Sequence, residues 1–117
     1  MHEASIVAGL LDIVREEMDK RELTKLVMVK VKYGKLAGVM PEAMDMAFEA
    51  MTMATPFEGA RLELEEVPAV LACRICKAEF QPGDNHILCV SCPACGEEFG
   101  HTLLSGKELH LERLEAE

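Results

Sequence analysis

Apolar residues near the start of the chain recur every three or four positions, the spacing of a helix that buries one face. Charged residues such as Arg15, Glu16 and Glu17 fall largely on the opposite face. The apolar positions are Ile6, Val7, Leu10, Leu11, Val14 and Met18. The pattern predicts an amphipathic helix from Ile6 to Met18, with Ser5 as its N-cap.

The period changes to two between Leu26 and Tyr33, where apolar residues alternate with Lys30 and Lys32. Such alternation is typical of a strand with one buried face. A second helix is predicted to begin at Pro41, because proline suits the first helical turn, and to end before Thr55.

Two further strands follow by the same alternation. One contains Leu62 and Leu64 on one face and Glu63 and Glu65 on the other, and another covers Glu108–Glu112. All five cysteines lie between these strands, beyond Pro68. The sequence therefore predicts an α+β fold, with two helices packed on a small three-stranded sheet and an inserted four-cysteine module resembling a zinc ribbon. The expected domains are residues 1–70 with 104–117, and residues 71–103 for the zinc-binding part.

The net charge of the chain disfavours some classes of binding partner. The chain has 12 Lys and Arg against 21 Asp and Glu, a formal net charge of −9, which disfavours a phosphate backbone as ligand. No apolar run approaches the length of a membrane span, and the N-terminus lacks the pattern of a secretory signal. A cytoplasmic protein without a membrane or nucleic-acid partner is expected, and thiols in that compartment stay reduced.

The cysteines form two C-x2-C pairs, Cys73 with Cys76 and Cys92 with Cys95, at the spacing of a structural zinc site. Gly96 directly after the second pair is suited to the positive φ that such a turn needs. Arg74 and Lys77 are placed to offset the charge of a Zn²⁺ ion with four thiolates. An iron centre and redox cysteines are weaker alternatives, since few aromatic residues are present to shield iron.

Cys89 leaves a second assignment open, because Cys89 and Cys92 are also a C-x2-C pair. Turn-forming Pro93 and Gly96 favour Cys92 with Cys95, whereas Cys89 lies in an apolar run and is expected to be a buried free thiol.

The first three residues offer a different metal chemistry. The α-amine of Met1, the amide nitrogen of His2 and its imidazole would lie in one plane, which suits Ni²⁺ or Cu²⁺. Glu3, another histidine or a partner would complete such a site. A site left incomplete can release its metal, as a carrier must.

Five methionines crowd the second predicted helix. A thioether metal site is conceivable, but the spacing of Met44 and Met51 is that of a core stripe. We expect flexible core filling, with an exposed remainder that helps a partner to dock.

These motifs together resemble the HypA/HybF family of nickel metallochaperones for hydrogenase maturation. The resemblance rests on Met1-His2-Glu3, Gly34-Lys35-Leu36, Pro41-Glu42, Phe48-Glu49, Gly59-Ala60, the paired C-x2-C motifs and Gly106. It implies a nickel domain with His2 as the key ligand, an inserted zinc domain, and two partners, the maturation GTPase and the hydrogenase large-subunit precursor. Some relatives also serve urease. The gap from Cys76 to Cys92 is slightly longer than usual for the family, which keeps Cys89 with Cys92 open as the alternative pair, and no histidine directly follows Cys76 or Cys95.

The leading hypothesis is therefore a nickel carrier with transient Ni²⁺ and structural Zn²⁺. The alternative is a zinc-ribbon adaptor that contacts nucleic acid or the transcription machinery, but few cations surround the cysteines to bind phosphates. An enzyme is not expected, because no catalytic arrangement stands out and four thiolates leave zinc no open position. The sequence leaves the oligomeric state open, a homodimer included.

Overall fold

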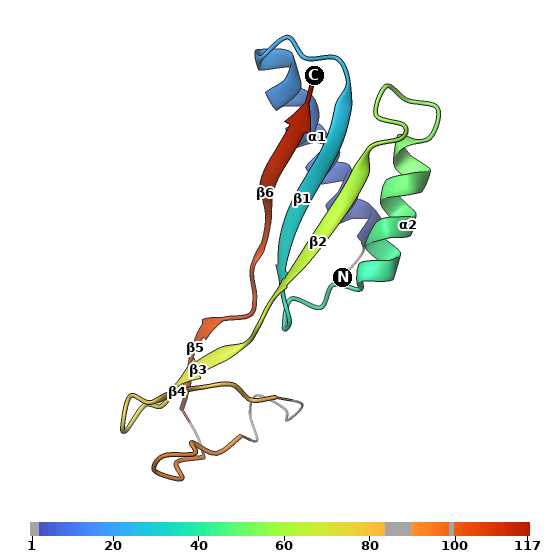
Figure 1. Ribbon diagram of the computed structural model, residues 1–117. Helices are drawn as coiled ribbons and strands as arrows, with labels where there is room; N and C mark the ends of the chain where they lie inside the picture. The colour runs from blue at the N-terminus through green and yellow to red at the C-terminus, as the bar shows by residue number, and fades with distance from the viewer. Residues whose placement is uncertain (1–2, 84–89, 99) are drawn as a thin grey trace.

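A computed structural model describes residues 3–83, 90–98 and 100–117 of the chain. The molecule is elongated, with extents of 55 × 25 × 16 Å. Two helices and a three-stranded sheet form one end, and a small second sheet with the cysteine loops forms the other (Figure 1). The α+β architecture predicted from the sequence is confirmed.

The two helices lie where hydrophobic periodicity placed them, with one correction. Helix α1 spans Glu3–Lys20, so Ser5 lies inside the helix and the predicted N-cap is wrong. An acidic Glu3 in the first turn is favourable at the positive end of a helix dipole. Helix α2 spans Pro41–Thr52, with proline in its first turn as predicted.

The large sheet has the order β2-β1-β6. Its central strand β1 (Leu26–Gly34) pairs in parallel with β2 (Arg61–Val67), and α2 provides the crossover that a parallel pair requires. On the other side β1 pairs antiparallel with β6 (Leu109–Ala116). This strand runs further than the predicted Glu108–Glu112.

A β-bulge explains why the sequence pattern predicted too short a strand for β6. Lys30 pairs with Arg113 but the next residue, Val31, pairs with Leu111, so the register shifts by one residue there. Leu111 and Leu114 consequently lie three positions apart, and strict alternation stops at the bulge.

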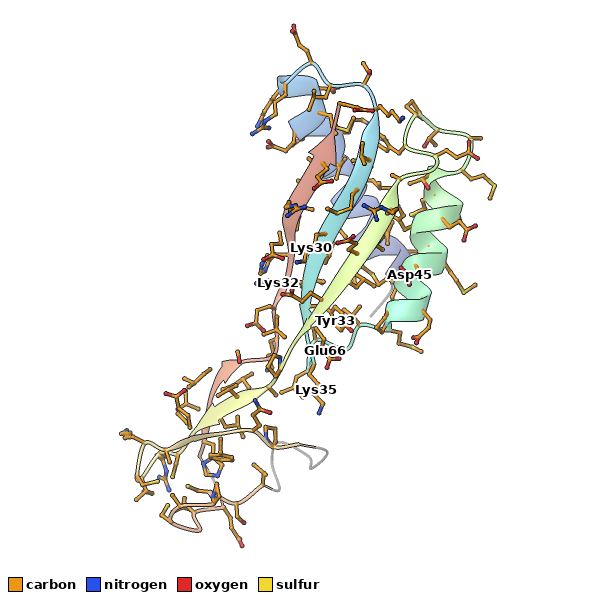
Figure 2. All side chains as sticks on the ribbon, in the orientation of Figure 1. Lys30, Lys32, Tyr33, Lys35, Asp45 and Glu66 are labelled. Carbon is orange, nitrogen blue, oxygen red and sulfur yellow. The ribbon has the colours of Figure 1, made fainter. Side chains whose placement is uncertain are left out.

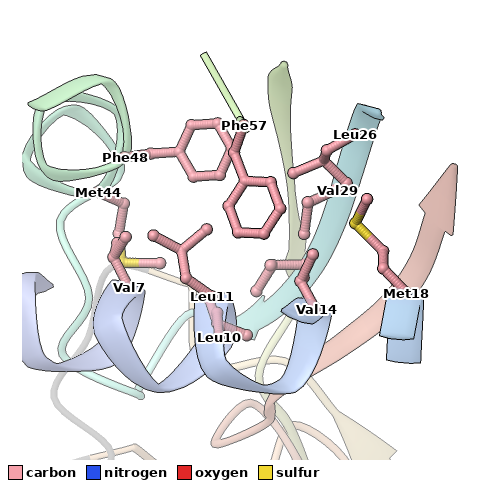
Figure 3. Packing of buried hydrophobic residues seen from close by; sticks show 11 residues of the cluster. Val7, Leu10, Leu11, Val14, Met18, Leu26, Val29, Met44, Phe48 and Phe57 are labelled. Carbon is pink, nitrogen blue, oxygen red and sulfur yellow. The ribbon is translucent and has the colours of Figure 1, made fainter. Parts of the chain in front are cut away.

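The core lies between the helices and one face of the large sheet, and Figure 3 shows its packing. It is aliphatic apart from two phenylalanines and contains two methionines, Met18 and Met44. Its buried members are Val7, Leu10, Leu11, Val14, Met18, Leu26, Val29, Val31, Met44, Phe48 and Phe57. Neither helix in the described part of the chain is long and apolar enough to cross a membrane.

The opposite face of the large sheet carries a charged network. Lys30 and Lys32 of β1 each pair with Glu65 of β2 and Glu112 of β6, at N–O distances from 2.9 to 3.6 Å (Figure 2). The bond from Lys32 lowers the pKa of Glu112 below its ordinary value of 4.5, while Glu112 raises the pKa of Lys32. The network therefore joins all three strands through their side chains.

Glu112→Gln is expected to flatten the pH dependence of stability in acid. Because the pKa of Glu112 is lowered in the folded state, its contribution is present above 4.5 and is lost as pH falls through the folded-state pKa. Urea unfolding from neutral pH down to acid would measure the change. Glu16→Gln, at an exposed site on α1, is the matched control, and an equal flattening by both variants would contradict the prediction.

The second sheet has the order β4-β3-β5, with both pairs antiparallel. Its strands β3 (Val70–Ala72), β4 (Glu79–Phe80) and β5 (Thr102–Ser105) are too short to show a period in the sequence. Leu71 at the centre of β3 is fully buried.

The two sheets meet at a junction formed by the turn after β1. Gly34 N–H donates to the carbonyl of Glu108, Lys35 N–H to Val67 and Leu36 N–H to Gly106, at 2.7 to 2.9 Å. A Cβ on Gly34 would lie 2.0 Å from the carbonyl carbon of Gly106, so this close approach requires glycine. Both chain segments that connect the sheets are thus bound to one turn.

Candidate metal centre

Two nearly identical backbone turns present the cysteines. In the first turn, Cys73 N–H donates to the carbonyl of Ala78 and Lys77 N–H donates to Cys73. In the second, Cys92 N–H donates to Glu97 and Gly96 N–H donates to Cys92. Each bond measures between 2.8 and 3.1 Å. The repeated C-x2-C spacing therefore produces two matching turns, as the spacing predicted.

A positive φ follows each cysteine pair. Gly96 has φ +82°, in agreement with the prediction, and Lys77 has φ +66° at the equivalent place of the first turn. Lysine carries a Cβ, so a positive φ costs it free energy. The residue type at position 77 therefore did not predict this backbone conformation.

The four sulfur atoms converge on one point. Those of Cys73, Cys76, Cys92 and Cys95 all lie within 4.8 Å of one another. Cys73 Sγ is 3.5 Å from Cys95 Sγ, and Cys76 Sγ is 3.5 Å from Cys92 Sγ. Both distances far exceed a disulfide bond, and a tetrahedron with Zn–S bonds of about 2.3 Å has edges of about 3.8 Å. The cluster fits zinc.

The electrostatics of the thiols also favour a cation. Backbone N–H groups of Cys76 and Ile75 lower the pKa of Cys73 to about 6. A bond from the backbone of Glu97 favours the thiolate of Cys95, but the neighbouring thiols outweigh it and raise the pKa of Cys95 to about 12. Repulsion among four neighbouring thiolates disfavours their full ionisation, and a bound Zn²⁺ would supply the compensating charge.

The cations expected to offset the site lie at its periphery. Arg74 Nη2 lies 3.9 Å from a carboxylate oxygen of Glu97, which links the first turn to the second. This ion pair reduces the positive charge that the first turn could offer to a nucleic-acid phosphate. Lys77 is exposed on the same turn.

His101 supports the second turn, a role that the cysteine spacing does not reveal. A ring nitrogen, Nε2, lies 3.1 Å from the carbonyl oxygen of Val90, two residues before Cys92. The ring also meets Phe80 of β4 edge-on, with centroids 5.0 Å apart. His101 thus connects the small sheet to the segment that leads into the second turn.

Of the other predicted ligands, only Glu3 lies within the described part of the chain. Met1, His2 and Cys89 lie outside the described residues. Glu3 lies in the first turn of α1. Its carboxylate accepts a hydrogen bond of 3.3 Å from the backbone N–H of Met40. This bond places Glu3 beside the start of α2.

Comparison with known proteins identifies the family. The family model described as "Hydrogenase/urease nickel incorporation, metallochaperone, hypA" matches residues 1–116. The chain belongs to this HypA family. Two relatives, each named "Hydrogenase maturation factor HypA", agree. The one from Solidesulfovibrio magneticus is 48% identical and the one from Lawsonia intracellularis 41%, with the whole of both chains covered in each comparison.

Solved HypA structures share the fold. The solution structure of the "Ni metallochaperone HypA from Helicobacter pylori" has a TM-score of 0.65 and 25% identity, covering 99% of this chain and 97% of the other. A second solution structure, of "HypA protein", has a TM-score of 0.71 and 26% identity, covering 99% and 96%. The elongated arrangement of helices, sheets and cysteine loops is therefore that of the HypA family.

The choice between Cys95 and Cys89 as the fourth zinc ligand is open to a direct test. Cys95→Ser is expected to lower zinc affinity strongly, because its sulfur belongs to the cluster, whereas Cys89→Ser should keep a full equivalent of zinc. Competition with a colorimetric chelator would measure both affinities. The opposite order of affinities would move the site to Cys89.

Proposed function

We propose that this chain is a nickel metallochaperone, which binds Ni²⁺ near its N-terminus and helps to deliver it to the large subunit of [NiFe]-hydrogenase. The observation that supports this most is the match of the HypA family model to nearly the whole chain. Ni²⁺ is the cargo, and zinc is a structural ion.

We further propose Cys73, Cys76, Cys92 and Cys95 as the zinc ligands. Four thiolates close the coordination sphere, so this zinc would have no position for water or substrate and no catalytic role. Its role would be to fix the fold of residues 71–103 as a zinc domain, beside a nickel domain formed by residues 1–70 and 104–117. The protein is then a carrier and not an enzyme.

The proposed nickel ligands are His2, through its imidazole and amide nitrogen, and the α-amine of Met1 in a chain that begins there. Three nitrogens in one plane suit Ni²⁺ and leave a fourth position open. Glu3 is a candidate for it, although one of its oxygens already accepts the bond from Met40. That bond is exposed and competes with water, so a metal could displace it.

Two partners belong to the proposal, the maturation GTPase of nickel insertion and the hydrogenase large-subunit precursor. The names of the relatives support a place in hydrogenase maturation, and the family description also mentions urease. A cytoplasmic location is part of the same proposal.

His2→Ala tests the function. The variant is expected to lose specific nickel binding, a drop in affinity of at least about tenfold, while its zinc content stays the same. One extra residue before Met1 should have a similar effect, because it turns the amine into an amide. The two changes disrupt one site, so their effects should not add.

Calorimetric titration with Ni²⁺, with zinc counted separately, would measure each variant. His110→Ala, at an exposed site on β6, is the matched control. A His2→Ala protein that binds nickel as tightly as the parent would contradict the N-terminal site.

A further inference from the structure

The outer side of α2 is unusually apolar for a surface helix. Seven large hydrophobic side chains are exposed among the described residues, and four of them are methionines between positions 40 and 53. Met46 within the helix has 73% of its surface accessible, and Met53 at the C-cap has 59%. Apolar side chains gathered in one place on a surface mark an interaction site more often than scattered ones do.

The same surface is uniformly acidic. Residues 36–60 contain Glu42, Asp45, Glu49 and Glu58 but no Lys, Arg or His. Asp45 (labelled on α2 in Figure 2) and Glu49 form no ion pair with any residue in the described ranges. We call Glu42, Asp45, Met46, Glu49, Met53 and Glu58 the α2 surface.

Several acidic residues on other faces are paired with cations of the chain. Glu17 on α1 is paired with Lys20 and Arg21, and Glu65 and Glu112 on the open face of the sheet are paired with lysines. Asp45 and Glu49 of the α2 surface therefore have no ion-pair partner among the described residues, so a cationic side chain of a partner protein would not have to displace one.

A groove of about 380 Å³ lies within the α2 surface, between α2 and the start of β2. Asp45, Glu49 and Glu58 supply carboxylates to its lining, and Phe48 and Leu62 supply apolar carbon. A lysine or arginine side chain has the matching form, since its aliphatic stem can lie on apolar carbon while its charged end meets carboxylates.

We propose that the α2 surface docks a segment of a partner protein that presents Arg or Lys beside large aliphatic side chains. The basic side chain would enter the groove, and the aliphatic ones would pack on Met46 and Met53, whose flexible thioethers adapt to different shapes. Arginine is favoured over lysine, because its planar group can bond two carboxylates at once.

Other occupants fit the surface less well. A second copy of the chain placed face to face would oppose carboxylates to carboxylates across the axis. An anionic membrane and a nucleic acid would both be repelled by the uncompensated acids. Glu3, a proposed nickel ligand, accepts a hydrogen bond from Met40 next to this surface. The docking proposal nevertheless does not require nickel to be bound.

The test uses the full chain without nickel and two synthetic helical peptides of about 18 residues, or five turns. One peptide has a leucine face flanked by arginines, and the other has glutamate in place of each arginine. Titration calorimetry would measure affinity, and amide chemical shifts would locate the contact. We expect the arginine peptide to bind and to shift the amides of α2, and the glutamate peptide not to bind.

Paired variants separate docking from general attraction between opposite charges. Met46→Ser with Met53→Ser, and Asp45→Asn with Glu49→Gln, should each weaken binding at least about tenfold. The matched controls lie on α1. They are Ile13→Ser, at a side chain that is 47% exposed, and the double variant Asp12→Asn with Glu16→Gln. Each control should change the affinity for the peptide less than about twofold. All seven positions are exposed, so these variants are expected to fold, which thermal melting would verify.

Four outcomes would overturn the proposal: equal weakening by the α1 variants, shifts spread over all acidic faces, self-association that the α2 variants abolish, or binding to anionic vesicles that they abolish. His2→Ala should bind the peptide as the parent does. Failure of nickel binding would therefore be distinguishable from failure of docking.

Discussion

Cys73→Ser is expected to release zinc and to loosen the two cysteine turns while the helices and the large sheet persist. The sulfur of Cys73 is almost fully buried and accepts a bond from Ile75 N–H, so it lies at the centre of the cluster. Binding of a structural zinc ion contributes about 10–16 kcal/mol in small zinc-binding peptides, far more than three strands of two to four residues can replace.

Metal analysis and amide spectra would measure this result. Signals of residues 90–98 should collapse toward unfolded positions, while those of β1 and α1 should stay dispersed because their core is separate. Ser91→Ala, an exposed change beside Cys92, is the matched control and should keep zinc. A Cys73→Ser protein with a full zinc equivalent would show that the cluster is not the zinc site.

Gly34→Ala is expected to destabilise the protein by about 3 kcal/mol, the upper end of what overpacking usually costs. The added methyl group would lie 2.0 Å from the backbone of Gly106, and backbone atoms cannot move aside as a flexible side chain does. The junction would have to open, at the expense of the bonds from Gly34 and Leu36.

Urea unfolding would measure the loss, with Gly9→Ala as the matched control. A Cβ at Gly9 meets nothing within 4 Å, and alanine is the better helix former, so this variant should gain up to about 1 kcal/mol. Equal stability of Gly34→Ala and the parent would mean that the junction yields easily.

Local pattern predicted the helices and the large sheet because each buries a face with a clear period. Six apolar residues place α1, and Pro41 places the start of α2. The errors fall where the period is interrupted or absent. Ser5 looked like a cap because it precedes the first apolar residue, but helical backbone continues through it to Glu3.

Tertiary contacts explain what the sequence could not show. Strands β3 to β5 have two to four residues each. They are stabilised by pairing with one another and by the cysteine turns next to them. The convergence of four sulfurs was expected from two C-x2-C pairs, but the choice of Cys95 over Cys89 rested on the turn residues Pro93 and Gly96 and not on spacing. The conformation of Lys77, the contacts of His101 and the lack of ion pairs for Asp45 and Glu49 among the described residues became visible only with the fold.

The position of the cysteine segment has a consequence for the order of folding. Tyr33 pairs with Leu109, so β6 completes the large sheet only after a long loop has closed, and the entropy lost on closure grows with loop length. Pairing of Val70 with Ser105 brings the ends of that loop together, and the metal joins the turns inside it. Zinc therefore shortens the effective loop and lowers the contact order of the remaining step. This segment precedes β6 in the chain, so zinc binding is expected to speed the pairing of a strand that contains none of the cysteines.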